Sequence, residues 1–455
     1  IYLGYALTLG ALGYLLVRDH NNKFIFPLGL VLLISNSAFL DFSTSGFETS
    51  LTYLLLIVFA VNLKNRTLRD KPWQSGLLLS LLVLNRPESF LLFVYVFLLY
   101  LFNIKRVGIP GVFKYVAPFL ITVVPYQIFR MGYFASLLPN TFYAKKGGDF
   151  YFTQGLNYLT DFAQSYPFTI FILVGLTLFF VVNLFTKKFA DNNANSRIHL
   201  LIMSALLAGY VLYAGGDYMH GRSLLMFFIL WVVSLNDLAD NIINLLIERI
   251  KGTDIEKPLA YTAALGGIFI LFFILKSQVP ITVQQKKQIN NINDERTHFG
   301  MKFDPDNYDQ YIQIPITGEF SWRDRGFYYR DIAETTNEII SVNMPNIGFF
   351  GYAAGDNVNV MGAVLIDPVM ARQPIENRGK IGHENLVDMS YLLSRKPTFS
   401  YTPFKYWNDS AHAKYHKSHY SGVITDDSND SYIPVFDMSH QQFLDNYKNI
   451  TGVDV

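Results

Sequence analysis

Long apolar blocks separated by short polar turns fill roughly the first 277 positions of this 455-residue chain. A helix that crosses a membrane needs about 20 mostly apolar residues, because the hydrocarbon layer is roughly 30 Å thick and each residue rises about 1.5 Å. The pattern predicts about ten membrane-spanning helices, several of them short by this standard. They cover residues 1–17, 24–40, 49–63, 73–84, 89–104, 115–129, 165–186, 198–214, 223–236 and 258–275.

Beyond a boundary near Lys276–Pro280, charged residues recur every few positions. There the pattern is compatible with a helix over 331–342. Runs of β-branched and aromatic residues between turn formers predict strands at 346–352 and 358–366. The sequence therefore predicts two domains: a helical polytopic membrane core over residues 1–277 and a mixed α/β soluble domain over residues 278–455.

The basic residues of the loops decide the orientation of the core. When the predicted loops are numbered alternately, one set holds fifteen Lys or Arg residues and the other holds five. Short loops rich in Lys and Arg stay in the cytoplasm. A single kinked helix over 73–104 would destroy this bias, so we expect two helices in a hairpin around Asn85–Glu88. The C-terminal domain then lies on the side of the membrane away from the cytoplasm.

Composition supports a membrane protein and excludes some other classes. Hydrophobic residues make up 51% of the chain and charged residues 16%, against roughly 25% charged in soluble proteins. A net charge of +1 gives no basis for nucleic-acid binding, which depends on clustered Lys and Arg. The absence of cysteine excludes disulfides and thiolate chemistry. Ile1 is not a start methionine and no signal segment precedes the first apolar block, so we expect the chain to be a fragment.

Four segments predicted to face outward carry ionisable side chains. They are Ser45–Thr49, Asn85–Glu88, Leu138–Lys145 and Gly215–Arg222. Their charged groups lie at one predicted membrane interface, where such groups usually pair or face a cavity. Arginine offers a fixed fork of donors that suits phosphate, and lysine a compact positive charge. The segments therefore predict a site for a lipid phosphate, in which Arg86, Lys145, His220 and Arg222 lie near Glu48, Glu88 and Asp217.

Structural interpretations of the same residues stay open. Interfacial Arg and Lys often only extend to lipid headgroups, Glu48 can favour a helix N-terminus, and Asp217 can cap a helix near Tyr218. The spacing of His412, His416 and His419 suits a helical metal pair. However, they lie in a Lys-, Tyr- and Ser-rich stretch without a nearby carboxylate, so we predict a solvated surface there and no metal site.

Seven short strings in this order resemble one known family. These strings are Ser45–Thr49, Arg86–Glu88, Leu138–Lys145, Gly215–Arg222, Gly348–Tyr352, Ile366–Arg372 and Ile381–His383. They are similar to strings of the terminal arabinofuranosyltransferases of arabinan-containing cell walls, which are GT-C glycosyltransferases that use a polyprenyl-phosphate sugar. The resemblance extends from about residue 40 to residue 385, and it implies a GT-C-like membrane core with an extracytoplasmic cap that assists the acceptor glycan.

The resemblance places the family's catalytic carboxylate in a loop after the first span, which we expect to lie upstream of Ile1. Within this chain Asp217 is the fallback base. For the growing charge on a lipid-phosphate leaving group we expect Arg86, Lys145, His220 and Arg222, and for a sugar hydroxyl Asn140. On the acceptor side the candidates are Asp367, Arg372 and His383. No metal is required, because basic side chains can carry the phosphate charge; a divalent cation is an open alternative.

The predicted function is inverting glycosyl transfer from a polyprenyl-phosphate sugar, with a pentofuranose as one option for that sugar. The acceptor is a cell-envelope glycan or lipid at the outer membrane face, and the other partners are membrane lipids. The alternative is a transporter or flippase for a lipid-linked saccharide. Transporters commonly show internal repeats with interrupted helices at the bilayer centre, and no repeat is evident here. A third option is a scaffold that only anchors the soluble domain.

Overall fold

The computed structural model describes most of the helical region and parts of the C-terminal region. The described residues are 2–18, 27–65, 71–146, 150–186, 193–250, 266–267, 269–280, 289–294, 322–337, 339–344, 347–362, 367–375, 378–382, 384–385, 391, 395, 399–403, 424–425 and 430–434. They divide into two compact units. The first comprises Ile1–Leu137 and Phe150–Glu295, and the second Leu138–Asp149 and Arg296–Val455.

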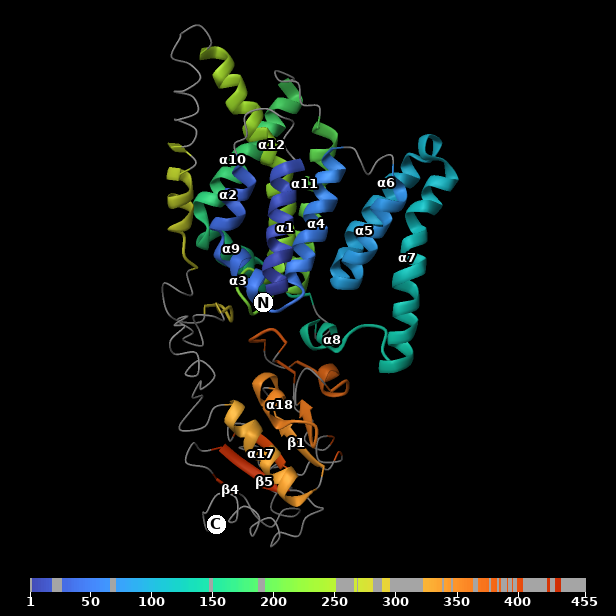
Figure 1. Ribbon diagram of the computed structural model, residues 1–455, viewed down its shortest axis with the longest axis vertical. Coiled ribbons are helices and arrows are strands. Elements are labelled where there is room, and N and C mark those ends of the chain that lie inside the picture. Colours follow the sequence, from blue (N-terminus) through green and yellow to red (C-terminus); the bar gives the residue numbers. More distant parts are fainter. Residues whose placement is uncertain are drawn as a thin grey trace. The chain divides into compact units, whose positions relative to one another are not determined.

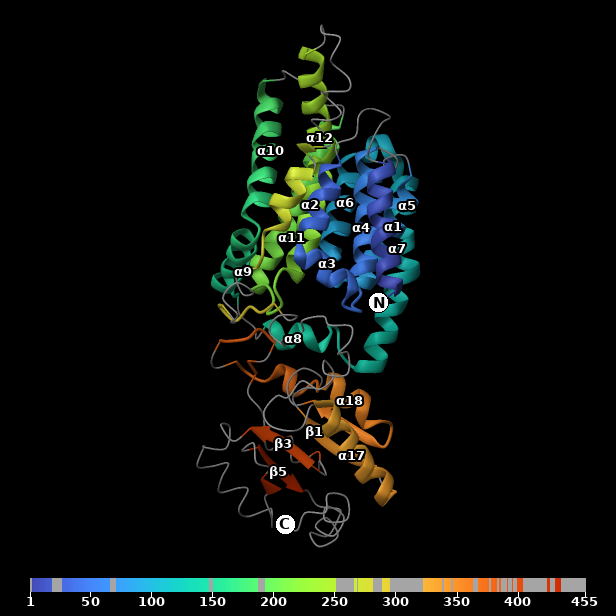
Figure 2. The same ribbon diagram turned by 60° about the vertical axis from the view of Figure 1, so that its left-hand side comes forward.

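The first unit is helical throughout its described part (Figure 1). Its helices are α1 (Tyr2–Arg18), α2 (Leu28–Ser35), α3 (Ser37–Thr44), α4 (Thr49–Lys64), α5 (Pro72–Asn85), α6 (Phe90–Phe102), α7 (Ile104–Phe134), α9 (Phe152–Ser165), α10 (Pro167–Thr186), α11 (Ala194–Ala214) and α12 (Leu225–Ile250), with short 3-10 helices η1 (Pro87–Ser89) and η2 (Arg222–Leu224). Helices α1, α2, α4, α11 and α12 form a central bundle, and α5, α6 and α7 pack together beside it (Figures 1 and 2).

Most predicted spans coincide with helices, but the predicted span 24–40 is wrong as one continuous helix. The chain leaves helical geometry at Asn36, whose backbone is extended, and Asn36 Oδ1 accepts a hydrogen bond from the Phe39 amide at 2.9 Å. An asparagine that accepts in this way caps the next helix. Helices α2 and α3 are therefore separate.

The hairpin predicted around Asn85–Glu88 agrees with the geometry. Arg86 is extended (φ −140°, ψ 109°) between α5 and η1. Pro72 and Ser75 at the start of α5 line the same cavity as Tyr100 and Asn103 at the end of α6 and just beyond it. The two helices therefore run in opposite directions.

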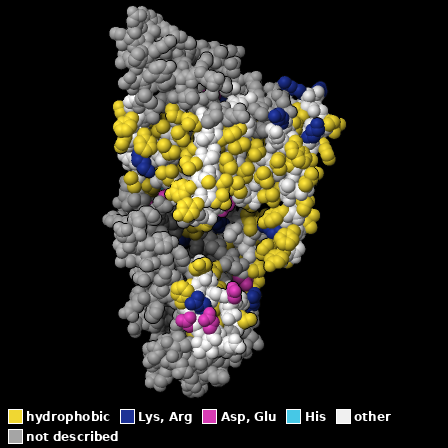
Figure 3. Space-filling view, in the orientation of Figure 1, with side chains coloured by type: hydrophobic (Ala, Val, Ile, Leu, Met, Phe, Trp, Pro, Cys, Tyr) yellow, Lys and Arg dark blue, Asp and Glu magenta, His cyan; other side chains and the backbone are white. Residues whose placement is uncertain are grey.

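Apolar side chains cover the outside of the helical unit as well as its core. Figure 3 shows hydrophobic side chains over most of the visible face of its helices. On α10, Phe171 is 77% and Phe185 84% exposed, and apolar patches of this kind mark contact with lipid or protein. By length and composition three described helices, α7, α10 and α11, suffice to cross a membrane; α3 and α4, bent by 118°, add a fourth if they count as one span. The total of ten spans stays a prediction.

The described part of the second unit contains a mixed sheet and several helices. Its elements are α8 (Asn140–Lys146), α17 (Trp322–Thr336), β1 (Ile340–Met344), α18 (Gly348–Ala354), β2 (Val358–Gly362), η4 (Met370–Arg372), β3 (Phe399–Pro403), β4 (Ile424–Thr425) and β5 (Asp430–Pro434). The strand order is β2-β1-β3-β5-β4, with β1 parallel to β2 and β3, and β5 antiparallel to β3 and β4. Helix α18 connects the parallel strands β1 and β2, as a crossover requires.

Two local predictions in this unit need correction. The predicted strand 346–352 is wrong, because residues 348–354 form α18. Its buried residues Phe350, Ala353 and Ala354 follow helical spacing, and they face α17, where Phe350 and Tyr329 meet edge to face at 5.8 Å. The helix expected over 331–342 ends at Thr336, and residues 340–344 form β1. The strand predicted from residue 358 is present as β2.

The boundary between the units differs from the predicted domain boundary at 277/278. The first unit continues to Glu295, and the second begins with the separate segment Leu138–Asp149. Residues 289–294 pack within the helical unit: the Asn293 amide donates to the Tyr218 carbonyl and the His220 amide to the Asn293 carbonyl, both at 2.8 Å. The extracytoplasmic location of the C-terminal domain stays a prediction.

Candidate active site

Arg86 is the first cation of the candidate site and is held between two carboxylates. Its Nη2 lies 2.8 Å from Glu48 Oε1, and its Nη1 lies 3.2 Å from Glu88 Oε1. The extended backbone at Arg86 and the turn at Pro87 direct this side chain back toward the start of α4. Asn85 strengthens the same junction by donating to the Glu48 carbonyl at 3.2 Å. The predicted proximity of Arg86 to both glutamates is therefore present.

Arg222 is the second cation, and the glycine-rich loop 215–221 positions it. Gly215, Gly216 and Gly221 all have positive φ, a conformation that glycine adopts at little cost. The resulting turn brings Asp217 under the guanidinium, so that Asp217 Oδ2 accepts from Arg222 Nε at 2.9 Å and from Nη2 at 2.5 Å. Burial alone lowers the pKa of Arg222, but the Asp217 charge prevails and the pKa lies above its ordinary value. Arg222 therefore stays charged.

Asp217 has the geometry of a positioning residue. Its side chain is 1% exposed, and Oδ1 accepts from the Tyr218 amide at 2.8 Å while Oδ2 holds Arg222 and the Ser223 hydroxyl. A carboxylate with a guanidinium on it is a weak base, because the positive charge favours the ionised form. No helix begins at Tyr218, so the predicted helix cap is absent, and the geometry favours a role in holding the loop and Arg222 over the role of general base.

Both arginines meet the turn between α3 and α4. The Arg222 guanidinium lies 5.7 Å from the centre of the Phe47 ring, within cation–π range, and the next residue, Glu48, pairs with Arg86. Three of the predicted segments, Ser45–Thr49, Asn85–Glu88 and Gly215–Arg222, are thus brought together within the helical unit.

His220, by contrast, is buried inside that unit. Its Nδ1 lies 2.6 Å from Asp161 Oδ2 on α9, and its Nε2 lies 3.1 Å from the Tyr166 hydroxyl. Tyr166 continues the network to the Ser37 hydroxyl at 2.7 Å and accepts from the Ala38 amide at 3.2 Å. With both ring nitrogens engaged and only 3% of the residue exposed, the geometry favours a role in fixing the loop over direct contact with a phosphate.

The remaining candidates belong to the second unit. Asn140 and Lys145 lie on α8, and that short helix contacts η4, where the Arg372 guanidinium sits 4.0 Å from the centre of the Tyr143 ring. Just before η4, Asp367 Oδ1 accepts from the Val369 amide at 2.8 Å, and its other oxygen accepts from Tyr391 and Arg395. His383 lies outside the described residues, as do His412, His416 and His419.

Comparison with known proteins connects these segments with a family. No protein-family model matches the chain, and no solved structure matches it. A terminal β-(1→2)-arabinofuranosyltransferase of Corynebacterium glutamicum is 26% identical over 462 residues, which is 88% of this chain and 66% of that relative. A protein of the same name from Mycobacterium tuberculosis is 29% identical over 227 residues, 44% of this chain and 36% of that relative. The resemblance seen in the short strings is confirmed.

The chain is therefore similar to arabinofuranosyltransferases, and three of its described helices are long and apolar enough to cross a membrane. It spans a little less than two thirds of the length of the first relative and about a third of the second.

Carboxylates outnumber guanidinium groups at the candidate site. Around the turn between α3 and α4, two guanidinium groups, Arg86 and Arg222, are matched by three carboxylates, Glu48, Glu88 and Asp217. Glu48 is the most exposed of the three at 44% of its side chain. An arriving phosphate must therefore compete with a carboxylate for Arg86, or bring a further cation. Among the described residues, no group of three His, Cys, Asp or Glu side chains is arranged to hold a metal ion.

Sequence analysis did not identify several residues that support the candidate site. Asp161 and Tyr166 fix His220, the Tyr158 hydroxyl donates to the Met219 carbonyl at 2.6 Å, and Asn293 pairs with the loop itself. One signal was available: Asp161 is the only charged residue of α9, and it lies on the buried face with Tyr158 and Phe162. Nothing in the sequence points to Asn293, because its pairing joins segments more than 70 positions apart.

Proposed function

We propose that this chain takes part in glycosyl transfer from a polyprenyl-phosphate sugar to a glycan or lipid of the bacterial cell envelope, at the outer face of the plasma membrane. The names of the relatives support a pentofuranose as the sugar. The observation that carries the proposal is the convergence of Arg86 and Arg222 on the turn at Phe47 and Glu48.

The proposed reaction breaks the bond between the anomeric carbon and the phosphate oxygen of the donor and forms a new bond to an acceptor hydroxyl. The acceptor proton passes to a carboxylate base, and the lipid phosphate leaves with the bonding electrons. The base is not assigned to a residue of this chain. Negative charge grows on the phosphate in the transition state, where positioned cationic donors give their largest benefit.

Arg222 suits this task because its charge is fixed before the donor arrives. Nε and Nη2 are directed at Asp217, so the orientation of the planar guanidinium is set. The side chain is 19% exposed, which leaves part of it open to a ligand. Arg86 acts beside it by exchanging the exposed Glu48 for a phosphate oxygen. In the second unit, Asn140 and Lys145 on α8 are proposed as further groups for the donor, and Asp367, Arg372 and His383 for the acceptor.

The test measures consumption of a panel of polyprenyl-phosphate sugars by membranes that contain the full-length protein. With the sugar that is consumed, Arg222→Lys is expected to reduce turnover at least 100-fold, since lysine keeps the charge but loses the fork of donors. Arg330→Ala on α17, whose ion pairs lie within its own helix, is the control and is expected to keep wild-type turnover.

Two outcomes contradict the proposal. If no lipid-phosphate sugar is consumed while a labelled lipid-linked saccharide crosses the membrane, the chain is a transporter. If Arg222→Lys folds to the wild-type melting temperature and turns over at the wild-type rate, Arg222 does not stabilise the leaving group.

A further inference from the structure

A polar cavity lies at the other end of the helical unit, away from Arg222. It has a volume of about 690 Å³ and is bounded by α4, α5, α6, α7 and α11. Leu63 at the end of α4 lines it, whereas Glu48 precedes the start of that 16-residue helix. Sixteen residues of helix measure about 24 Å, so the cavity and the Arg222 site are separated by nearly the thickness of the hydrocarbon layer.

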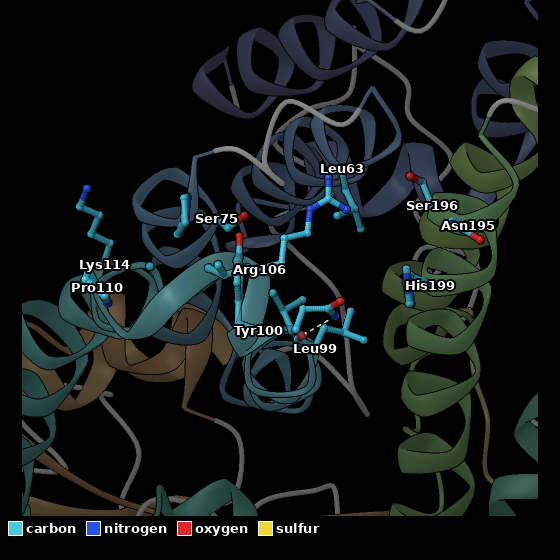
Figure 4. A pocket seen from close by; sticks show the side chains of 15 residues that line it. Leu63, Ser75, Leu99, Tyr100, Arg106, Pro110, Lys114, Asn195, Ser196 and His199 are labelled. Atoms are coloured by element: carbon cyan, nitrogen blue, oxygen red, sulfur yellow. Dashed lines mark hydrogen bonds between the residues drawn. The ribbon is translucent and has the colours of Figure 1, made fainter.

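The walls of this cavity change character from one side to the other. Leu63, Val96 and Leu99 supply apolar lining. In Figure 4, Asn195, Ser196 and His199 on α11 lie across the gap from Leu63 and Leu99. In Figure 4 His199 projects from α11 toward the cavity, where its Nδ1 lies 2.8 Å from the Tyr95 hydroxyl of α6. Such a surface suits a ligand with an apolar tail and a polar head.

The cations of the cavity lie on either side of a kink in α7. Gly108 has φ 73° and ψ 161°, a backbone conformation that is readily available only to glycine. The kink lets Arg106, before it, and Lys114, after it, line the same cavity. In the described part of the chain neither side chain has an ion-pair partner, and the cavity lining contains no Asp or Glu. The cavity therefore carries uncompensated positive charge.

We propose that this cavity binds the phosphate headgroup of an anionic phospholipid from the membrane leaflet at this end of the unit. Basic pockets between membrane helices bind anionic headgroups through the surface potential and direct hydrogen bonds. Arg106 holds the phosphate, Lys114 adds positive charge at the rim, and an acyl chain lies along Val96 and Leu99. The site does not depend on glycosyl transfer, and it is distinct from the Arg222 site.

The proposal is tested with the purified full-length protein in nanodiscs of phosphatidylcholine that contain a minor fraction of phosphatidylglycerol. Native mass spectrometry counts the phosphatidylglycerol that stays bound after release. Arg106→Ala is expected to lower that retention on the order of 5-fold, and Arg106→Ala with Lys114→Ala on the order of 10-fold or more. Lys105→Ala is the matched control: Lys105 is exposed like its neighbour Arg106, but it does not line the cavity. It is expected to retain the lipid within 2-fold of wild type.

Two further arms keep the test decisive. Arg106→Lys preserves charge and is expected to retain most of the lipid even if the alanine variants fold poorly. Inorganic phosphate is added to nanodiscs of pure phosphatidylcholine. If it protects the protein thermally as well as phosphatidylglycerol does, the cavity is a site for soluble anions and the lipid assignment fails. Equal retention of phosphatidylglycerol by wild type and by the folded double variant also overturns the proposal.

Discussion

At the scale of single residues, four of the ionisable residues predicted at one interface divide into two roles. Arg86 and Arg222 stay partly open at the turn around Phe47 and Glu48. Asp217 and His220 are buried and hold other groups in place. The sequence analysis grouped His220 with the arginines as a phosphate ligand, because proximity along a loop does not reveal which side chains turn inward. The residues that are open to a phosphate are therefore different from the residues that hold them in position.

The buried pair Asp161 and His220 yields a residue-scale prediction. Asp161→Ala and His220→Ala are each expected to destabilise the protein, since each leaves a buried polar partner unsatisfied, at a cost of about 1–3 kcal/mol. Because the two side chains share one hydrogen bond, the double variant is expected to lose less than the sum, with a coupling of about 0.5–3 kcal/mol. Chemical unfolding of the four proteins in detergent, followed by tryptophan fluorescence, measures the coupling.

The control for this cycle is Asp161→Ala combined with Asn62→Ala. Asn62 lies on α4 and forms hydrogen bonds with Tyr14 and the Val58 carbonyl, so it shares no partner with Asp161. The two losses of stability are therefore expected to add. Additive losses for Asp161 and His220 would mean that they do not interact.

At the scale of elements, close approach of helices and loops decides which positions accept a side chain. Gly216 combines φ 79° with the ring of Tyr158, which a Cβ would meet at 2.5 Å. Gly46 has φ 80° but open space around it, and Gly209 in α11 has helical backbone and open space. A comparison of these three positions therefore distinguishes the cost of a left-handed backbone from the cost of a steric clash.

Alanine at these three glycines is therefore expected to give graded effects. Gly209→Ala is expected to be neutral or to stabilise by up to about 1 kcal/mol, through helix propensity. Gly46→Ala costs about 1–2 kcal/mol for a left-handed backbone. Gly216→Ala adds a clash and costs about 2–4 kcal/mol. Melting temperatures in one detergent give the order, and a Gly216→Ala protein as stable as Gly209→Ala would show that the loop does not pack against Tyr158.

A buried ion cluster shows how elements alter an interpretation made from charge alone. Lys64 and Arg197 were counted among the basic residues of the cytoplasmic loops. In the structure both are fully buried on α4 and α11, and both pair with Asp237 of α12, at 3.1 and 2.9 Å. They join three helices at the same end as the cavity. Without these two residues, the loops predicted to be cytoplasmic still hold more Lys and Arg than the loops predicted to face outward.

At the scale of the whole molecule, the orientation in the membrane is the property on which the proposed function depends. The chain has no cysteine, so a single introduced cysteine is the only thiol. Leu137, 58% exposed, follows α7 at the end predicted to lie outside, and Lys105 lies at the opposite end of that helix. Labelling these two positions tests the sidedness of the helical unit by itself.

Leu137→Cys is expected to react with a membrane-impermeant maleimide in intact cells, and Lys105→Cys only after the cells are lysed. The basic excess of the loops gives the reason, since such loops are retained in the cytoplasm. The cysteine-free parent protein is the labelling control. The reverse pattern would put the Arg222 site in the cytoplasm and remove the basis for a reaction at the outer face.

The sequence by itself determined the membrane character, the positions of most helices and the family resemblance. These properties depend on local composition and on short strings, which need no knowledge of distant partners. It also predicted the proximity of Arg86 to Glu48 and Glu88, because Arg86 and Glu88 are neighbours and the hairpin returns to the start of α4.

Only the tertiary structure decided the break at Asn36, the helical state of residues 348–354, the burial of His220 and the cavity at Arg106. Each depends on what packs against a segment from elsewhere in the chain: Phe350 against Tyr329, His220 against Asp161, and α11 against the hairpin of α5 and α6. Burial and hydrogen bonding across long separations in sequence outweigh local preference, and no local pattern records them.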